Sequence, residues 1–177
     1  MSCAARAVFA ENRRGLYTPA FRGVDESPPM TCVRIEEFDR ADTDALVRMW
    51  RESFEHGVGI VDPHPLEEQV AYFEREVLPA NRVQVAKEGS LIVGFIAAGP
   101  EAVMQLHVRV GHHRRGLGTR LLNLAKAQSG GTLWLYTFAR NTTACAFYES
   151  QGFEVIQRGF EPTWQLEDVK YAWSASR

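Results

Sequence analysis

A short segment near the middle of the chain combines glycines and arginines in an arrangement that suits an anion. Residues 104–126 read as an apolar strand, a tight basic turn with Gly116 and Gly118, and an amphipathic helix. The first N–H groups of a helix lack backbone partners and carry the positive end of the helix dipole, so they can hold a phosphate. Arg114, Arg115 and Arg120 add charge to the same turn. The segment predicts a site for a phosphorylated cofactor.

Two well-known phosphate loops do not fit this segment. No G-K-[ST] follows the glycines, as a P-loop requires, and Leu121 stands where the dinucleotide fingerprint has its third glycine. Nucleotide hydrolysis and hydride transfer are therefore not indicated. A glycine-bearing basic turn is also common as plain solvated surface, so the turn taken alone leaves both interpretations open.

Two motifs in the chain resemble those of the GNAT superfamily of acyl-CoA-dependent N-acetyltransferases. The cofactor motif L-x-V-x-P-x-x-[QR]-x-x-G-x-[GA] is matched in spacing by Leu106, Val108, Gly116 and Gly118. Val110 replaces its proline and His113 its Gln or Arg. A later block, N-x-x-A-x-x-F-Y-x-x-x-G-F, is matched by Asn141, Ala144, Phe147, Tyr148, Gly152 and Phe153. The resemblance covers residues 31–174.

The resemblance implies acetyl-CoA as co-substrate, without a metal, in a V-shaped opening between two parallel strands. The pantetheine arm would bond to strand backbone as an added strand does, and the pyrophosphate would rest on the basic turn. The implied cofactor-binding residues are Leu106, His107, Val108, His113, Arg114, Arg115, Gly116, Leu117, Gly118, Thr119 and Asn141.

Tyr148 matches the family position whose hydroxyl reaches the cofactor sulfur, so the resemblance implies that it is the general acid. A phenol can protonate a departing thiolate. The base is left open, because Met104 and Gln105 stand where many relatives carry an acid. A water chain is one alternative, and the candidate side chains are His107, Glu161, Glu167 and Asp168.

The implied activity is acetyl transfer to a primary amine, either on a small molecule or on a protein lysine or N-terminus. The three acidic candidates favour a cationic acceptor. The alternative is a domain that binds acyl-CoA as a sensor or scaffold without turnover. A monomer or a homodimer is expected.

Composition narrows the class of protein further. The 177 residues suit one domain, and the net charge of −2 favours neither nucleic acid nor an anionic membrane as partner. No apolar run is long enough to span a membrane. The three cysteines show no metal or disulfide spacing, which fits the cytoplasm. Cys145 lies in an expected helix and is interpreted as a packing residue rather than a nucleophile.

The first 30 residues lack helical or strand periodicity and are predicted to form a tail, with a transit peptide as the alternative. Residues 31–177 are then a single N-acetyltransferase domain. A metal site around His56 and His64, with Asp62 between them, is not favoured. The two histidines do not form an i, i+4 pair, and no third ligand stands at a suitable spacing.

Hydrophobic periodicity predicts the elements that position these residues. Strands are expected at 32–38, 82–86, 91–98, 104–110, 133–138, 153–160 and around 169–173. Helices are expected after Asp39 with an end at Gly57, from Pro65 to Pro79, from Gly118 to Gly130, and from Asn141 to Gly152. The predicted fold is a three-layer α/β (α+β) domain. Its six- or seven-stranded sheet is mixed, mostly antiparallel, and flanked by about four helices.

Overall fold

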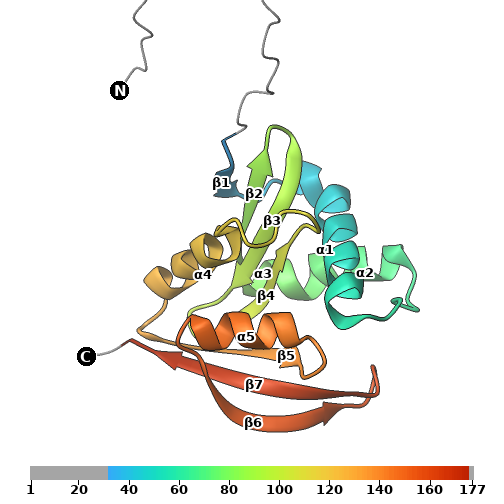
Figure 1. Ribbon diagram of the computed structural model, residues 1–177. Helices are drawn as coiled ribbons and strands as arrows, with labels where there is room; N and C mark the ends of the chain where they lie inside the picture. Colours follow the sequence, from blue (N-terminus) through green and yellow to red (C-terminus); the bar gives the residue numbers. More distant parts are fainter. Residues whose placement is uncertain (1–31, 176–177) are drawn as a thin grey trace, which may run out of the picture. The chain divides into compact units, whose positions relative to one another are not determined.

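The computed structural model describes residues 32–175 (Figure 1). Within this range seven strands form two antiparallel sheets, one in the order β1-β2-β3-β4 and the other in the order β5-β7-β6. Helices cover the sheets, and the predicted α/β fold class is confirmed. The N-terminal tail predicted for residues 1–30 lies outside the described residues.

The first sheet consists of β1 (Arg34–Glu37), β2 (Arg82–Glu88), β3 (Leu91–Ala98) and β4 (Val103–Val108). The predicted hairpin between β2 and β3 turns at Gly89, whose φ of +62° is accessible to glycine at little cost. Seven of the eight β3 residues are buried, because both faces of this strand are covered. Phe95 packs in the hydrophobic cluster on one face and Ile96 in the cluster on the other.

The second sheet consists of β5 (Thr132–Phe138), β6 (Glu154–Glu161) and β7 (Leu166–Ser174). The strand-helix-strand order predicts a parallel β4–β5 pair, yet the structure reduces this pair to one isolated parallel bridge between Ala102 and Trp134. The two strands separate beyond the bridge, so the expected single mixed sheet is divided in two (Figure 1). Backbone groups at this division are available to a ligand.

Helix α1 (Thr43–Val58) follows a short 3₁₀ turn, η1 (Arg40–Asp42), which Asp39 caps through a 3.0 Å bond from the Ala41 N–H to its carboxylate. The prediction that the helix begins directly after Asp39 is therefore wrong by one turn. The predicted end at Gly57 is also wrong, since Gly59 ends the helix with a φ of +72°.

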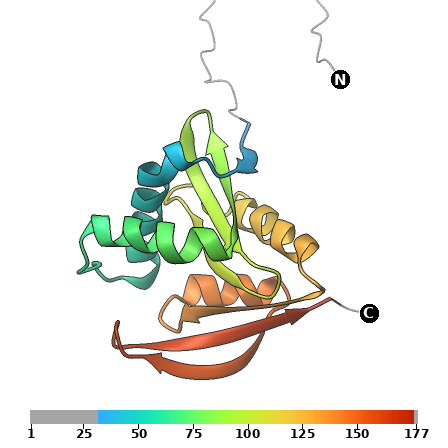
Figure 2. The same cartoon turned by 180° about the vertical axis from the view of Figure 1, so that it is seen from behind.

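Helix α2 (Leu66–Tyr72) continues through a wider π-helical turn, η2 (Phe73–Val77), into the short α3 (Leu78–Ala80). Pro65 precedes the first turn as the N-cap instead of occupying it, and the helix passes Pro79 by one residue. Figure 2 shows α2 and α3 crossing the rear of the first sheet. The π turn keeps both Phe73 and Val77 buried against that sheet.

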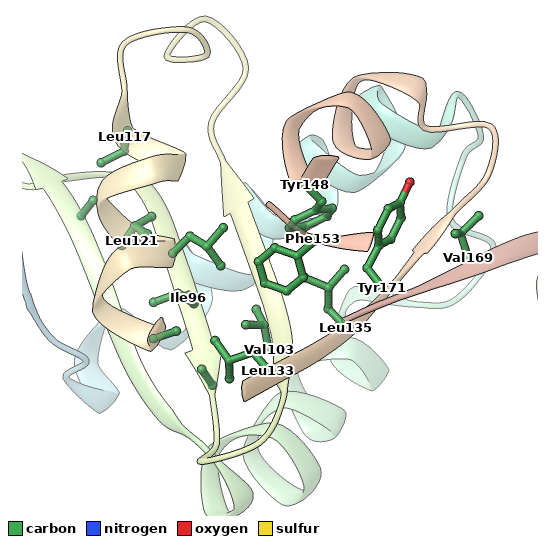
Figure 3. Packing of buried hydrophobic residues seen from close by; sticks show 14 of the residues in the cluster. Ile96, Val103, Leu117, Leu121, Leu133, Leu135, Tyr148, Phe153, Val169 and Tyr171 are labelled. Atoms are coloured by element: carbon green, nitrogen blue, oxygen red, sulfur yellow. The ribbon is translucent and has the colours of Figure 1, made fainter. Parts of the chain in front are cut away.

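Helix α4 (Leu117–Gln128) covers the opposite face of the first sheet, and α5 (Thr142–Ser150) packs on the second. Leu121 and Ile96 from the first half share one cluster with Leu133, Phe153 and Tyr171 from the second (Figure 3). This cluster joins the two sheets where backbone pairing does not.

Candidate active site

An open cavity of about 1800 Å³ lies at the division between β4 and β5. Its walls come from β4, the turn before α4, α5, α1 with the following loop, α2, and the β6–β7 hairpin. Cavities for drug-sized ligands are usually about 300–1000 Å³, so this one has room for a large cofactor together with a second substrate.

The turn before α4 has the geometry of an anion site. Gly111, Arg114 and Gly116 have φ values of +87°, +61° and +74°, which fold the chain back before the helix begins at Leu117. The first backbone bond into the helix runs from the Arg120 N–H to the Gly116 carbonyl, at 3.0 Å. The N–H groups of Leu117, Gly118 and Thr119 come before this bond and have no helical partner, and all three residues line the cavity.

Most of the residues predicted at this turn do line the cavity, namely His113, Arg114, Gly116, Leu117, Gly118 and Thr119. Arg115 does not, and Arg120 donates instead to the carbonyl of Val33, at 3.2 Å. Of the three arginines expected to charge this turn, the cavity wall therefore contains only Arg114 among the described residues.

Gly118 has a packing role that the sequence did not reveal. A Cβ added there would lie 3.3 Å from Cζ of Phe147 and 3.9 Å from Cγ2 of Val108. A Cβ added at Gly116 would meet no atom within 4 Å, so glycine is favoured there by the positive φ alone. The first turn of α4 can thus approach α5 closely because residue 118 lacks a side chain.

Leu106, His107 and Val108 lie on β4 and all three line the cavity. The Val108 carbonyl already accepts hydrogen bonds from Ser53 Oγ at 3.0 Å and from His113 Nε2 at 2.8 Å. His113, which replaces the Gln or Arg of the GNAT motif, therefore holds the turn against the end of β4.

The His107 side chain projects toward α1 rather than α4. Its ring stacks on Phe95 with centroids 5.7 Å apart and lies 5.9 Å from the ring of Trp50, while Nε2 donates to Gln105 Oε1 at 3.0 Å. Burial among these groups lowers the pKa of His107 to about 3. His107 is consequently neutral near pH 7 and a poor proton acceptor.

Tyr148 comes from α5, and its ring packs in the cluster of Figure 3 at 5.8 Å from Phe153 and 6.0 Å from Tyr171. The residue lines the cavity although it is only 7% exposed, and its hydroxyl bonds to no other described residue. Burial, with a further contribution from Cys145, raises the pKa of Tyr148. The phenol therefore keeps its proton at physiological pH and can only donate it.

Asn141 caps α5, since its side-chain oxygen accepts the Ala144 N–H at 3.1 Å. A Cβ added at Gly57 would lie 2.8 Å from the Asn141 amide nitrogen, so Gly57 makes room for this cap instead of ending α1. Cys145 is half-buried, and its sulfur faces the carbonyls of Phe138 and Ala139 at about 4 Å. These contacts make Cys145 a packing residue.

The acidic candidates for the base differ in position. Glu167 is exposed and does not line the cavity, whereas Glu161 and Asp168 do. Desolvation raises the pKa of Glu161, but hydrogen bonds from Trp164 and Thr163 outweigh it and leave the pKa below its usual value. Glu161 is thereby a weakened base.

One arrangement in the cavity was not found from the sequence. Asp62 and His64, in the loop between α1 and α2, form a hydrogen-bonded pair with 2.9 Å between a carboxylate oxygen and Nδ1. Their spacing in the sequence suggests them only as metal ligands together with His56. No group of three such side chains among residues 32–175 is placed to hold a metal ion. The available signal was the Asp-x-His spacing in a loop beside two helices.

The split sheet, with a glycine turn leading into α4 beside it, defines a GNAT-type acyltransferase fold. A family model described as the acetyltransferase (GNAT) domain matches residues 79–155. This match, and the fold shared with solved GNAT acetyltransferases, support acyltransferase activity for this chain.

Three similar proteins illustrate the relationship. The peptidyl-lysine N-acetyltransferase YiaC of Escherichia coli K12 is 23% identical over 140 residues, covering 78% of this chain and 95% of the relative. The apo-form of YjaB from E. coli superposes with a TM-score of 0.67 at 20% identity, over 82% of this chain and 99% of that one. The protein yncA of Salmonella typhimurium, solved with acetyl-CoA, has a TM-score of 0.62 at 18% identity, over 82% of this chain and 95% of that one.

The helices in the described part of the chain are too short or too polar to cross a membrane.

Proposed function

We propose that the protein transfers the acetyl group of acetyl-CoA to a primary amine by direct attack. The observation that carries the proposal is one continuous cavity, whose wall includes the anion-binding turn, β4, Tyr148 and the α1–α2 loop. A cofactor bound at one end would present its thioester to an acceptor that enters from the other.

In the proposed complex the pyrophosphate rests on the N–H groups of the first turn of α4, with Arg114 beside it. The pantetheine arm lies along β4 at Leu106 and His107, where the parallel pairing with β5 is missing. Asn141 acts by fixing the start of α5, which carries Tyr148.

In the proposed reaction a neutral amine attacks the thioester carbonyl carbon, a C–N bond forms and the C–S bond breaks. Tyr148 gives its proton to the departing sulfur and recovers one from the attacking nitrogen as the intermediate collapses. The sum is one amine and acetyl-CoA converted to an amide and CoA. Because the pKa of Tyr148 is raised, its proton is in place throughout the physiological range.

The charges on the cavity wall favour a cationic acceptor. Four carboxylates line the cavity, those of Asp62, Glu68, Glu161 and Asp168. Among the described residues that line it, the one Lys or Arg is Arg114, at the cofactor turn. Such a wall attracts an ammonium group and disfavours an acceptor that bears its own carboxylate or phosphate. The lysine specificity in the name of YiaC is consistent with this chemistry.

The test is thiol release from acetyl-CoA with tyramine, spermidine and Nα-acetyl-lysine methylamide as acceptors, and with mass spectrometry of the products. Acetylation of at least one amine, at a rate well above hydrolysis, is expected. Micromolar acetyl-CoA binding with no transfer to any amine would instead support the alternative, a sensor or scaffold that holds acyl-CoA. A cytoplasmic location and a monomeric or homodimeric state stay predictions from the sequence.

A further inference from the structure

The loop between α1 and α2 holds a histidine in a fixed orientation. The Asp62 carboxylate accepts hydrogen bonds from the His64 backbone N–H and from His64 Nδ1, each at 2.9 Å. Its other oxygen lies 3.6 Å from a guanidinium nitrogen of Arg51. The Asp62 side chain is only 7% exposed, whereas that of His64 is 42% exposed. The carboxylate is thus buried behind an imidazole that reaches the cavity.

Arg51 fixes the same loop from the body of α1. Its guanidinium donates to the His64 carbonyl at 2.8 Å and, through Nε, to Gln69 on α2 at 2.8 Å. The carboxylate of Glu55 accepts the Asp62 N–H at 2.9 Å. The His64 ring also contacts the edge of Trp164 from the β6–β7 hairpin, with centroids 5.3 Å apart. The loop backbone is therefore fixed by α1, and the imidazole contacts Asp62 and the β6–β7 hairpin.

These contacts determine which nitrogen of His64 is free. A carboxylate can only accept, so Nδ1 carries the proton and Nε2 keeps its lone pair. Nε2 bonds to no other described residue, and His64 lines the cavity. Other ionisable groups contact the neighbours of this ring: Arg51 and Glu55 contact Asp62, and Glu161 accepts the Trp164 N–H. Glu68 on α2 lines the same cavity.

We propose that His64, oriented by Asp62 and Arg51, is the base that takes the proton from the ammonium group of the acceptor. The inference rests on the proposed acetyl transfer and completes it. His107 and Glu161 are weak proton acceptors for the reasons given above, and Glu167 lies outside the cavity. Asp168 lines the cavity, but no hydrogen bond to another described residue orients its carboxylate. His64 has both a free lone pair and a buried carboxylate that stabilises the imidazolium once it forms.

The proposed step is a proton transfer that precedes the attack. The ammonium gives one proton to Nε2, directly or through one water, and becomes a neutral amine. The imidazolium passes this proton to solvent through the open mouth of the cavity. The neutral amine then attacks the thioester, and the second proton follows the route through Tyr148 to the sulfur.

The test compares wild type with His64→Gln on whichever of the three amines wild type acetylates fastest, between pH 6 and pH 10. The kcat/KM of His64→Gln is expected to fall about 100-fold at pH 7. The deficit should shrink toward pH 10, where an alkylamine with a pKa of about 10.4 is increasingly neutral without a base. His56→Gln is the matched control, because His56 also lines the cavity but donates to no carboxylate among the described residues.

A deficit for His64→Gln that is the same at every pH, or one confined to KM, would overturn the proposal and make His64 a binding residue. If wild type acetylates none of the amines, the proposed acetyl transfer itself is refuted. That result differs from an active wild type with a pH-independent His64→Gln deficit, which refutes only the role of His64 as base. A second measurement does not depend on activity. Long-range ¹H–¹⁵N spectra of the wild-type histidines, with His64 assigned through the variant, should show a proton on Nδ1, and a proton on Nε2 would also overturn the proposal.

Discussion

The burial of His107 predicts how the stability of the fold depends on pH. The folded pKa of about 3 lies below the value of about 6.5 for an exposed histidine, so the unfolded chain binds the proton more readily. The stability that comes from a neutral His107 is therefore fully present above pH 6.5 and is lost as pH falls from there toward 3. A pH of 5 is 1.5 units below the unfolded pKa, so His107 is protonated in the unfolded chain but still neutral in the folded one. At 1.36 kcal/mol per unit the loss is about 2 kcal/mol.

The assay is urea unfolding of wild type and His107→Gln at pH 7 and pH 5. Glutamine can keep a hydrogen bond to Gln105 but does not titrate, and the other four histidines contribute equally to both proteins. Between pH 7 and pH 5 wild type should lose about 2 kcal/mol more unfolding free energy than the variant. A difference below about 0.5 kcal/mol would show that folded His107 accepts a proton, and would restore it as a candidate base.

Three further predictions concern the cofactor half and the chain start. Tyr148→Phe should keep its melting temperature and acetyl-CoA affinity while single-turnover acetyl transfer falls about ten- to a thousand-fold, and an unchanged rate would remove the general-acid role. Gly118→Val should weaken acetyl-CoA binding at least about tenfold in calorimetry, because its Cβ meets Phe147 at 3.3 Å. Gly130→Val, with nothing within 4 Å, is the control. A chain beginning at Met30 should keep wild-type melting and affinity, and a drop of more than a few degrees would make residues 1–29 part of the folded domain.

The cofactor half of the site could be predicted because its residues are close together in sequence. A strand, a glycine turn and a helix occupy residues 103–128, and their periodicity and spacing can be recognised without knowledge of the tertiary contacts. The boundaries that went wrong depended on tertiary contacts. Gly57 looked like a helix end, but it accommodates the Asn141 side chain from a helix 84 positions later, and no local pattern records such a contact.

The acceptor half could not be predicted, because it is assembled from separate segments. Trp164 of the β6–β7 hairpin lies 5.0 Å from Phe54 on α1 and 5.3 Å from His64 in the loop, measured between ring centroids. Each residue alone is an ordinary aromatic in a loop or helix, and only the fold places the three together. The division of the sheet has the same origin, since strand periodicity does not report whether neighbouring strands pair along their full length.

The two halves also differ in what holds them, and this difference has a consequence for specificity. Tyr148 and the start of α4 rest on the cluster that joins the two sheets, so substitutions there disturb both the fold and the cofactor end. His64 and Trp164 belong to neither hydrophobic cluster. His64 is held by Arg51 and Asp62, and Trp164 by its N–H bond to the Glu161 carboxylate and by ring contact with Phe54. Exchanging residues in this loop and hairpin should therefore change which amine is accepted while melting temperature and acetyl-CoA affinity stay close to wild type.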